Sequence, residues 1–172
     1  MGNSNTITSE EFVKFINENR SKLYKTAMAI LKNDDDACDA IQDALLSAYK
    51  NISSLKNKKY FLTWLTRILI NKCYDIISKN KKITYVDSDI TENTIGYVDS
   101  YSAESILENT LNRIDDSLRE VAVLYYYDEF SVEDISNILS IPKGTVKSRL
   151  SRARTQLYEI IKKEEGELDE GH

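Results

Sequence analysis

Apolar residues recur every three to four positions along most of the chain, which is the spacing of one face of an α-helix. In residues 9–31 this period predicts one long helix or two short ones. Residues 33–36 are Asn-Asp-Asp-Asp, a combination that favours a helix N-terminus, and the period then continues to residue 52. Residues 60–78 predict a further helix. We therefore expect three or four helices that close a first domain near residue 80.

The helical period stops in the middle of the chain and then returns. Residues 83–102 are rich in Asp, Ser, Thr and Asn and lack a helical period, which is typical of a linker. From residue 103 the period resumes, and a second core indicates a second domain. The predicted fold class is all-α, with two small helical domains joined by a flexible linker. The predicted boundaries are an N-terminal domain at 8–82, the linker at 83–102, a C-terminal domain at 103–163 and an acidic tail at 164–172.

The composition supports a helical chain and removes several kinds of catalytic site. Five Gly and one Pro in 172 residues leave few residues for β-turns. The only histidine is His172 and the only cysteines are Cys38 and Cys73, which excludes a histidine-based triad, a Cys/His zinc site and a disulfide framework. No apolar run is long enough to cross a membrane, so we expect no direct membrane insertion. Two unpaired cysteines favour a reducing cytosol. We expect a cytoplasmic, non-catalytic protein without metal or cofactor.

Charge is distributed very unevenly along the chain. The net charge is −5, yet residues 56–82 contain eight basic residues and one acidic residue. Residues 140–163 contain seven basic residues and one acidic residue. Two basic segments in an acidic protein indicate two separate contacts with a polyanion, although either segment alone is equally consistent with a solvated helix face.

The clearest local pattern lies in residues 131–157, where a short helix, a break at 140–142 and a longer helix predict a helix-turn-helix. In the second helix Val146, Leu150 and Ala153 share the side that faces a core. The other residues near its N-terminal half are basic, small or polar. The candidate DNA contacts there are Lys143, Gly144, Thr145, Lys147, Ser148, Arg149 and Arg152.

These candidates suit different parts of a DNA duplex. Arg152 and Ser148 have the chemistry for base edges, whereas Lys147, Arg149 and Thr145 suit phosphates. Gly144 lacks a side chain where the backbone would approach DNA closely. The alternative is a helical hairpin with an ordinary basic face.

A second pattern interleaves cations and aromatic rings in residues 55–72. Rings that stack on bases, beside ammonium groups that meet phosphates, are typical of single-stranded nucleic-acid binding. Asn71 lies one helical turn beyond Arg67 and has the groups to hydrogen-bond a base edge. The alternative, which we favour for Phe61 and Trp64, is that these rings are core residues.

A third pattern is a polar face on the helix over residues 36–49. Asp39, Gln42 and Asp43 lie opposite Ile41 and Leu45 on this helix. Such a face is either a protein-docking surface or an ordinary solvated face.

These three segments, in this order, resemble the extracytoplasmic-function family of bacterial RNA polymerase sigma factors. DACDAIQDALLSAYKNI resembles the helix that binds the polymerase clamp, FLTWLTRILINKCYD the −10 region, and GTVKSRLSRAR the helix that reads the −35 element. The resemblance covers about residues 10–162. It implies a sigma factor that binds core RNA polymerase, recognises the −10 and −35 promoter elements and promotes transcription initiation.

The resemblance also implies roles for individual residues. Core polymerase would be bound by Asp39, Ile41, Gln42 and Asp43. The −10 strand would be bound by Leu55, Lys56, Lys58, Lys59, Tyr60, Arg67, Asn71 and Lys72, with residues 55–60 capturing a flipped base. The helix from Lys143 to Arg152 would read the duplex −35 element, and an anti-sigma factor would be a further partner. Cys38, Ser78 and the Lys56-Asn57-Lys58 run depart from the usual family pattern, and the last leaves the −10 base preference open.

Two other functions remain as alternatives. A stand-alone helix-turn-helix regulator would require dimerisation, and it leaves residues 1–80 without a role. A metal-dependent enzyme could use Asp34, Asp35 and Asp36, but consecutive carboxylates at a helix start point in different directions.

Overall fold

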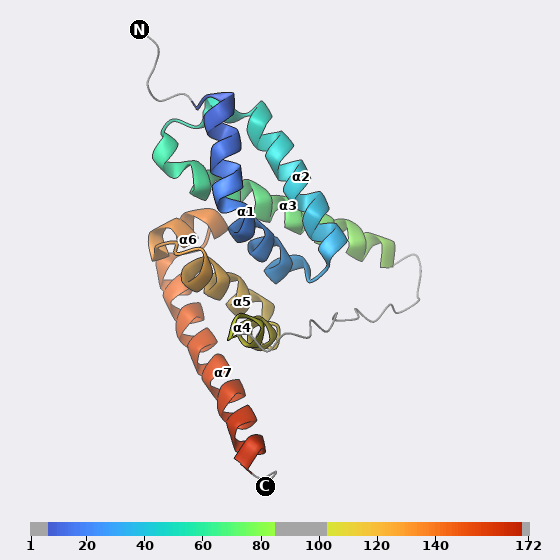
Figure 1. The fold of residues 1–172 in the computed structure, drawn as a ribbon, viewed down its shortest axis with the longest axis vertical. Coiled ribbons are helices and arrows are strands. Elements are labelled where there is room, and N and C mark those ends of the chain that lie inside the picture. Colours follow the sequence, from blue (N-terminus) through green and yellow to red (C-terminus); the bar gives the residue numbers. More distant parts are fainter. Residues whose placement is uncertain (1–6, 85–102, 170–172) are drawn as a thin grey trace. The chain divides into compact units, whose positions relative to one another are not determined.

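The computed structural model describes residues 7–84 and 103–169, and every regular element in these residues is a helix. The chain divides into two compact units. The first contains α1 (Ser9–Leu31), α2 (Asp34–Lys50) and α3 (Phe61–Thr84) (Figure 1). The second contains α4 (Ala103–Leu111), α5 (Asp116–Ala122), α7 (Lys143–Asp169) and most of α6 (Val132–Leu139). The all-α prediction with two helical units is confirmed.

A stripe of small side chains on α2 lets the three N-terminal helices pack closely. Its four buried members recur every three to four residues, and they are Ala37, Ala40, Ala44 and Ala48. Figure 1 shows α1 beside α2, and each of the three helices contacts the other two. Larger side chains of α1 and α3, among them Leu23, Leu65 and Leu69, fill the core around this stripe. Since alanine carries no long side chain, the neighbouring backbones can approach α2.

Aromatic rings close one end of this core. Phe61 at the start of α3 stacks on Phe15 at 5.1 Å and meets Phe12 edge-on at 5.6 Å between ring centroids. Phe61 is buried, and the half-buried Trp64 packs against the same cluster. Phe61 is therefore a core residue, as the second of the two interpretations held, and its ring is not available for base stacking.

Side-chain caps fix the start of the first two helices. Thr8 and Glu11 form a reciprocal capping box at the start of α1. Asn33 accepts a hydrogen bond from the Asp36 amide at 2.9 Å and caps α2, whose first turn holds three aspartates. The Tyr24 hydroxyl donates to Asp34 at 2.7 Å. These carboxylates thus have a structural role at a helix N-terminus, where the helix dipole favours negative charge.

Two short 3₁₀ turns connect α2 to α3. They are η1 (Ile52–Ser54) and η2 (Lys58–Tyr60). The Asn57 side chain accepts the Lys59 amide at 2.9 Å and caps η2. We call residues 51–60 the α2–α3 loop.

The second unit contains the predicted helix-turn-helix. Ser131 and Asp134 form a capping box at the start of α6, and the turn before α7 follows Ser140. Before α6, α5 runs into a π-helical turn, η3 (Val123–Tyr127). Ile135 and Ile138 of α6 are buried, and so are Val146, Leu150 and Ala153 of α7. Helix α7 packs against α5 and α4 of the same unit.

The described helices extend beyond two predicted boundaries. α3 ends at Thr84, two residues into the segment predicted as linker, and residues 85–102 lie outside the described part of the chain. α7 continues to Asp169, so 164–169 of the predicted acidic tail are helical. None of the described helices has the length and apolarity that crossing a membrane requires.

Candidate nucleic-acid and protein interfaces

The helix α7 separates its core side from its candidate DNA-binding side. Val146, Leu150 and Ala153 are buried, as the sequence predicts. Ser148 and Arg152 are both exposed and lie one turn apart, on the side of the helix opposite these core residues. They form the middle row of the exposed surface of α7.

Two further rows flank Ser148 and Arg152. Lys143 and Lys147 are exposed along one side, and Thr145 and Arg149 are half-buried along the other. Each pair is four residues apart and so shares a helix face. Rows on either side of a base-reading row lie where the sugar–phosphate backbones of a duplex pass. The division between base contacts and phosphate contacts stays a prediction, which these three rows allow.

The turn before α7 holds its N-terminus in place. Ser140 adopts the left-handed conformation at φ 54°, and the Ser136 hydroxyl donates to the Ile141 carbonyl at 2.6 Å. Lys143 donates to Glu133 of α6 at 2.9 Å, so part of its charge is directed to a neighbour within the unit. A Cβ placed on Gly144 would meet no described atom within 4 Å. The packing of the unit itself therefore does not require a glycine at this position.

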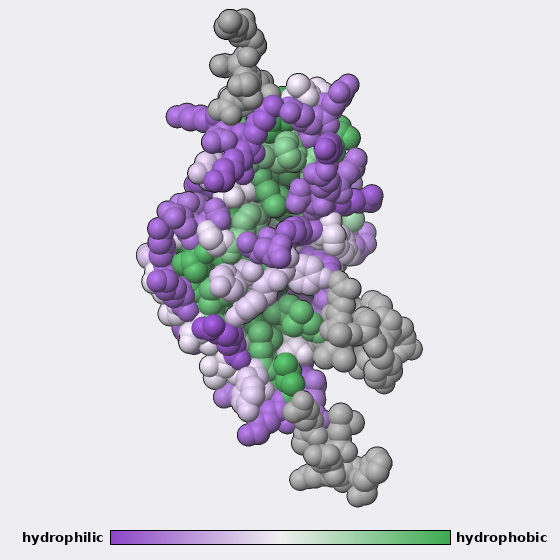
Figure 2. Space-filling model, turned by 60° about the vertical axis from the view of Figure 1, so that its left-hand side comes forward, coloured by the Kyte–Doolittle hydropathy of each residue, from purple (hydrophilic) through white to green (hydrophobic). Residues whose placement is uncertain are grey.

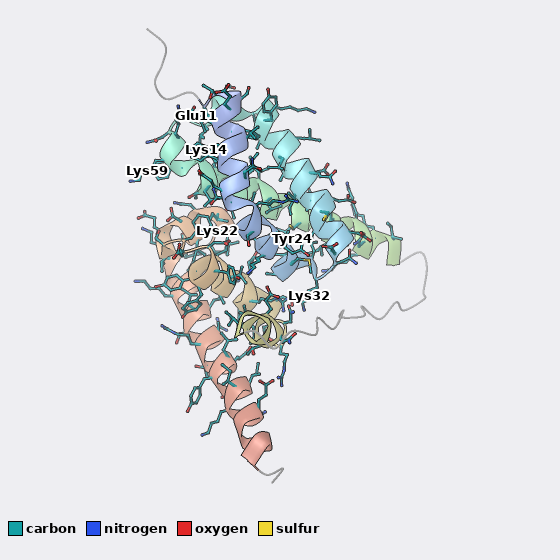
Figure 3. The ribbon with its side chains drawn as sticks, in the orientation of Figure 1. Glu11, Lys14, Lys22, Tyr24, Lys32 and Lys59 are labelled. Carbon is teal, nitrogen blue, oxygen red and sulfur yellow. The ribbon has the colours of Figure 1, made fainter. Side chains whose placement is uncertain are left out.

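The candidate −10 residues of the α2–α3 loop differ in their accessibility. Lys56, Lys59 and Tyr60 are exposed, whereas Leu55 is half-buried and packs against the core. Figure 3 shows Lys59 on the turn before α3, with its side chain directed outward. Lys58 is different again, because its ammonium group donates to both carboxylate oxygens of Glu11. The structure thus gives Lys58 a partner inside the protein.

The exposed face of α3 continues the loop. Arg67 and Asn71 are exposed and lie one turn apart on this face. Tyr74, 44% exposed, lies on the same face and was missed by the sequence analysis, which read the aromatic pattern only to Trp64. The spacing of 67, 71 and 74 is the signal that could have identified it. Lys72 is half-buried and lies more than a quarter-turn around the helix from Arg67, so it is not on the face that carries Arg67, Asn71 and Tyr74.

The polar face of α2 is exposed at Asp39, Gln42 and Asp43. Ile41 is instead half-buried and packs against the core cluster. Leu46, 59% exposed, lies one turn beyond Gln42 and Asp43, and the sequence reasoning assigned it to neither face of this helix. A groove beside this face is lined also by Ile76, Lys79 and Asn80 of α3.

The surface around these residues is dominated by polar groups. In the view of Figure 2, hydrophilic side chains cover most of the N-terminal unit, and hydrophobic side chains show between them. Among the described residues, no group of three or more His, Cys, Asp or Glu side chains could hold a metal ion.

Comparison with known proteins identifies both units of the chain. The family model described as Sigma-70 region 2 matches residues 15–83, and the model described as Sigma-70, region 4 matches residues 105–157. The ECF RNA polymerase sigma factor SigW of Bacillus subtilis is 33% identical over 168 residues, which cover 89% of this chain and 90% of SigW. RNA polymerase sigma factor SigV of the same organism is 25% identical over 146 residues, 85% of this chain and 88% of SigV.

A solved structure shares the arrangement of the helices. It is the sigma factor RpoE of Bartonella quintana in complex with the anti-sigma factor NepR, with a TM-score of 0.80 and 26% sequence identity. The match covers 89% of this chain and 98% of RpoE.

Proposed function

The chain belongs to the extracytoplasmic-function family of RNA polymerase sigma factors, and from this membership we propose which of its surfaces serves each step of transcription initiation. A sigma factor binds core RNA polymerase, recognises the −10 and −35 promoter elements and promotes initiation. One observation carries the assignment: two separate basic surfaces, one on each unit of an acidic chain, have the side-chain chemistry for two different forms of DNA.

The −35 element is the duplex contact, and α7 makes it. Ser148 and Arg152 reach base edges, and the rows on either side, with Gly144 at the close approach, meet the phosphates. Free backbone N–H groups at the N-terminus of α7 add to the phosphate contact.

The −10 element is the single-stranded contact, and the α2–α3 loop and the exposed face of α3 make it. Tyr60 and Tyr74 offer rings for stacking, while Lys56, Lys59 and Arg67 supply positive charge. We retain Leu55, Asn71 and Lys72 in this surface as predictions, with Lys72 the least favourably oriented of them.

Core polymerase is bound by the exposed face of α2. Asp39, Gln42 and Asp43 supply charge and hydrogen bonds, and Leu46 adds the apolar contact that a stable protein interface needs. Ile41 supports this face from the core side of the helix.

Transcription by the reconstituted enzyme tests the function. Run-off transcription with core polymerase, with and without this protein, on a genomic library should give promoter-selective initiation only when the protein is present. Initiation that the protein leaves unchanged would overturn the proposal. Sequence-specific binding of the free protein, as a dimer, to a palindromic site would instead support a stand-alone regulator.

A charge reversal tests the polymerase-binding face. Asp43→Arg should weaken the association with core polymerase while the far-UV circular dichroism of the protein is unchanged, because Asp43 is exposed. Glu18→Arg, a reversal of an exposed acid on α1, is the matched control and should leave the association intact. If core enzyme retains both variants equally, the face is wrongly assigned.

We also propose a cytoplasmic, non-catalytic protein that an anti-sigma factor regulates. The support for this partner is that the solved relative RpoE was captured in complex with the anti-sigma factor NepR. The acidic remainder of the chain opposes DNA binding until polymerase orients the two basic surfaces. Strong sequence-specific binding of promoter duplex by the free protein at physiological salt would contradict this last point.

A further inference from the structure

An ion pair joins the start of α1 to the α2–α3 loop across 47 positions of sequence. The Lys58 ammonium group donates to both carboxylate oxygens of Glu11, each at 2.8 Å. Lys58 is only 27% exposed at its side chain, and Glu11 is 40% exposed. Two of the three donors of this lysine are therefore occupied within the protein.

Glu11 is itself held by the cap of α1. Its carboxylate accepts the Thr8 amide at 2.9 Å, while its own amide donates to the Thr8 hydroxyl at 3.2 Å. The hydrogen bond from Lys58, followed by that from the Thr8 backbone, lowers the pKa of Glu11. A charged carboxylate with a fixed orientation is a firmer anchor than the end of a flexible surface side chain, since less side-chain entropy remains to be lost.

Lys58 lies in η2, the same turn that carries the exposed candidates Lys59 and Tyr60. Lys58 follows Asn57, whose side chain caps η2, and precedes Lys59 and Tyr60. The next residue, Phe61, packs its ring on Phe12 and Phe15 of α1. Helix α1 thus holds Lys58 of the loop by charge and Phe61, at the start of α3, by apolar packing. Figure 3 labels Glu11 on α1 and Lys59 on the turn before α3.

We propose that Glu11 and Lys58 are positioning residues for −10 recognition: their ion pair holds Lys59 and Tyr60 in place for the unpaired strand, and Lys58 makes no phosphate contact. This inference rests on the proposed function of the α2–α3 loop. A loop that is ordered before DNA arrives pays less entropy on binding, so the pair improves recognition without touching the strand.

The test measures binding of fluorescent single-stranded −10 oligonucleotides to the reconstituted holoenzyme at several salt concentrations. The variants are Glu11→Gln, Lys58→Met and the two together. Each single variant should lower the preference for the promoter sequence over a scrambled strand by about two- to fivefold, and the double variant should lose no more. The slope of log K against log salt should stay unchanged, because no phosphate contact is removed. Glutamine is accepted in a capping box, so Glu11→Gln keeps α1 capped.

Two controls separate positioning from direct contact. Lys59→Met removes an exposed cation and should reduce the salt slope by about 0.7, the value for one single-strand phosphate. Glu10→Gln changes the neighbouring exposed acid and should have no effect.

Two results would overturn the inference. One is a fall of about 0.7 in the salt slope for Lys58→Met, with Glu11→Gln neutral or tighter-binding. The other is additive losses in the double variant. If Tyr60→Ala and Lys59→Met also leave −10 binding unchanged, the proposed function of the loop fails as well. If these two variants weaken −10 binding while the Glu11 and Lys58 variants do not, only the positioning role is refuted.

Discussion

The two candidate DNA-binding surfaces are constructed in different ways. The −35 surface lies on one continuous helix, α7, where every candidate from Lys143 to Arg152 takes its direction from the same backbone. The −10 surface combines a loop of two 3₁₀ turns with the face of α3, and a residue of α1 secures the loop. The first surface is locally determined, and the second depends on contacts that are distant in sequence.

This difference matches the form of DNA that we propose for each surface. A duplex has a regular groove, so a helix with rows of side chains four residues apart can fit it as a rigid body. An unpaired strand has no fixed shape, and binding it requires separate rings and cations held at suitable positions. The tertiary contacts of the α2–α3 loop supply that order.

The largest expected effect is on the helix surface. Arg152→Ala should weaken promoter binding by the holoenzyme by about 1–3 kcal/mol, and only on templates with the preferred −35 sequence. Binding to a panel of −35 variants measures it, with Arg154→Ala as the control for an exposed arginine outside the middle row. Equal losses on every −35 sequence would reassign Arg152 to the phosphates.

Removal of one exposed ring from the −10 surface should weaken single-strand binding and leave the −35 preference unchanged. Tyr60→Ala removes a 51% exposed ring and should cost about 1–2 kcal/mol of single-strand affinity, with the −35 preference unchanged. Tyr74→Ala should cost less, because it lies farther along α3. Binding of −10 oligonucleotides measures both. An altered −35 preference in Tyr60→Ala would show that the two surfaces are not independent.

Gly144→Ala separates DNA contact from folding at the start of α7. The unit has space for the added methyl group, so its stability should be unchanged or raised by up to about 1 kcal/mol. Promoter affinity should fall by roughly tenfold, about 1.4 kcal/mol, if the backbone approaches DNA at this position. Thermal denaturation and promoter binding of the same sample provide the two readouts. Undiminished affinity would remove Gly144 from the interface.

A residue in the left-handed backbone conformation follows α1 in one unit and α6 in the other, and glycine substitutions there compare the stability of the two units. Ser140 after α6 has φ 54° and Lys32 after α1 has φ 55°. Ser140→Gly and Lys32→Gly should each stabilise their own unit by about 0.5–1 kcal/mol, because glycine adopts this conformation without the Cβ penalty. Trp64 is the only tryptophan and lies in the N-terminal unit, so its fluorescence reports the unfolding of that unit. Its transition should shift in Lys32→Gly but not in Ser140→Gly, where circular dichroism should detect the change.

The smallest expected effect is the pH dependence of the Glu11 ion pair. The pKa of Glu11 is lowered in the folded protein, chiefly by the hydrogen bond from Lys58, so the pair stabilises the fold above the ordinary carboxylate pKa. That contribution is lost as the pH falls through the lowered pKa. The Trp64 unfolding midpoints of the protein and of Glu11→Gln should differ at neutral pH and converge in acid. A constant difference across this range would show that the charge of Glu11 is not responsible.

The sequence predicted which side chains are buried and which are exposed where a single helix sets their directions. The core side of α7 at Val146, Leu150 and Ala153 follows from the helical period, and so does the exposure of Ser148 and Arg152. On α2 the same reasoning placed Asp39, Gln42 and Asp43 outward and Ile41 and Leu45 inward, but it left Leu46 unassigned. The four buried alanines define the core side of α2, and Leu46 lies on the side of the helix away from them.

By itself, the sequence determined the all-α class, the helix-turn-helix and the two basic surfaces, because helical period and charge are local properties of the chain. Only the tertiary structure decided which residues of the α2–α3 loop are accessible. Phe61 is buried by two rings of α1, and Lys58 is paired with an acid 47 residues away. Lys59 and Tyr60 remain exposed beside them. The sequence favoured a core position for Phe61, but it cannot distinguish Lys58 from Lys59, since Glu11 is brought to Lys58 by the packing of α1 against α3.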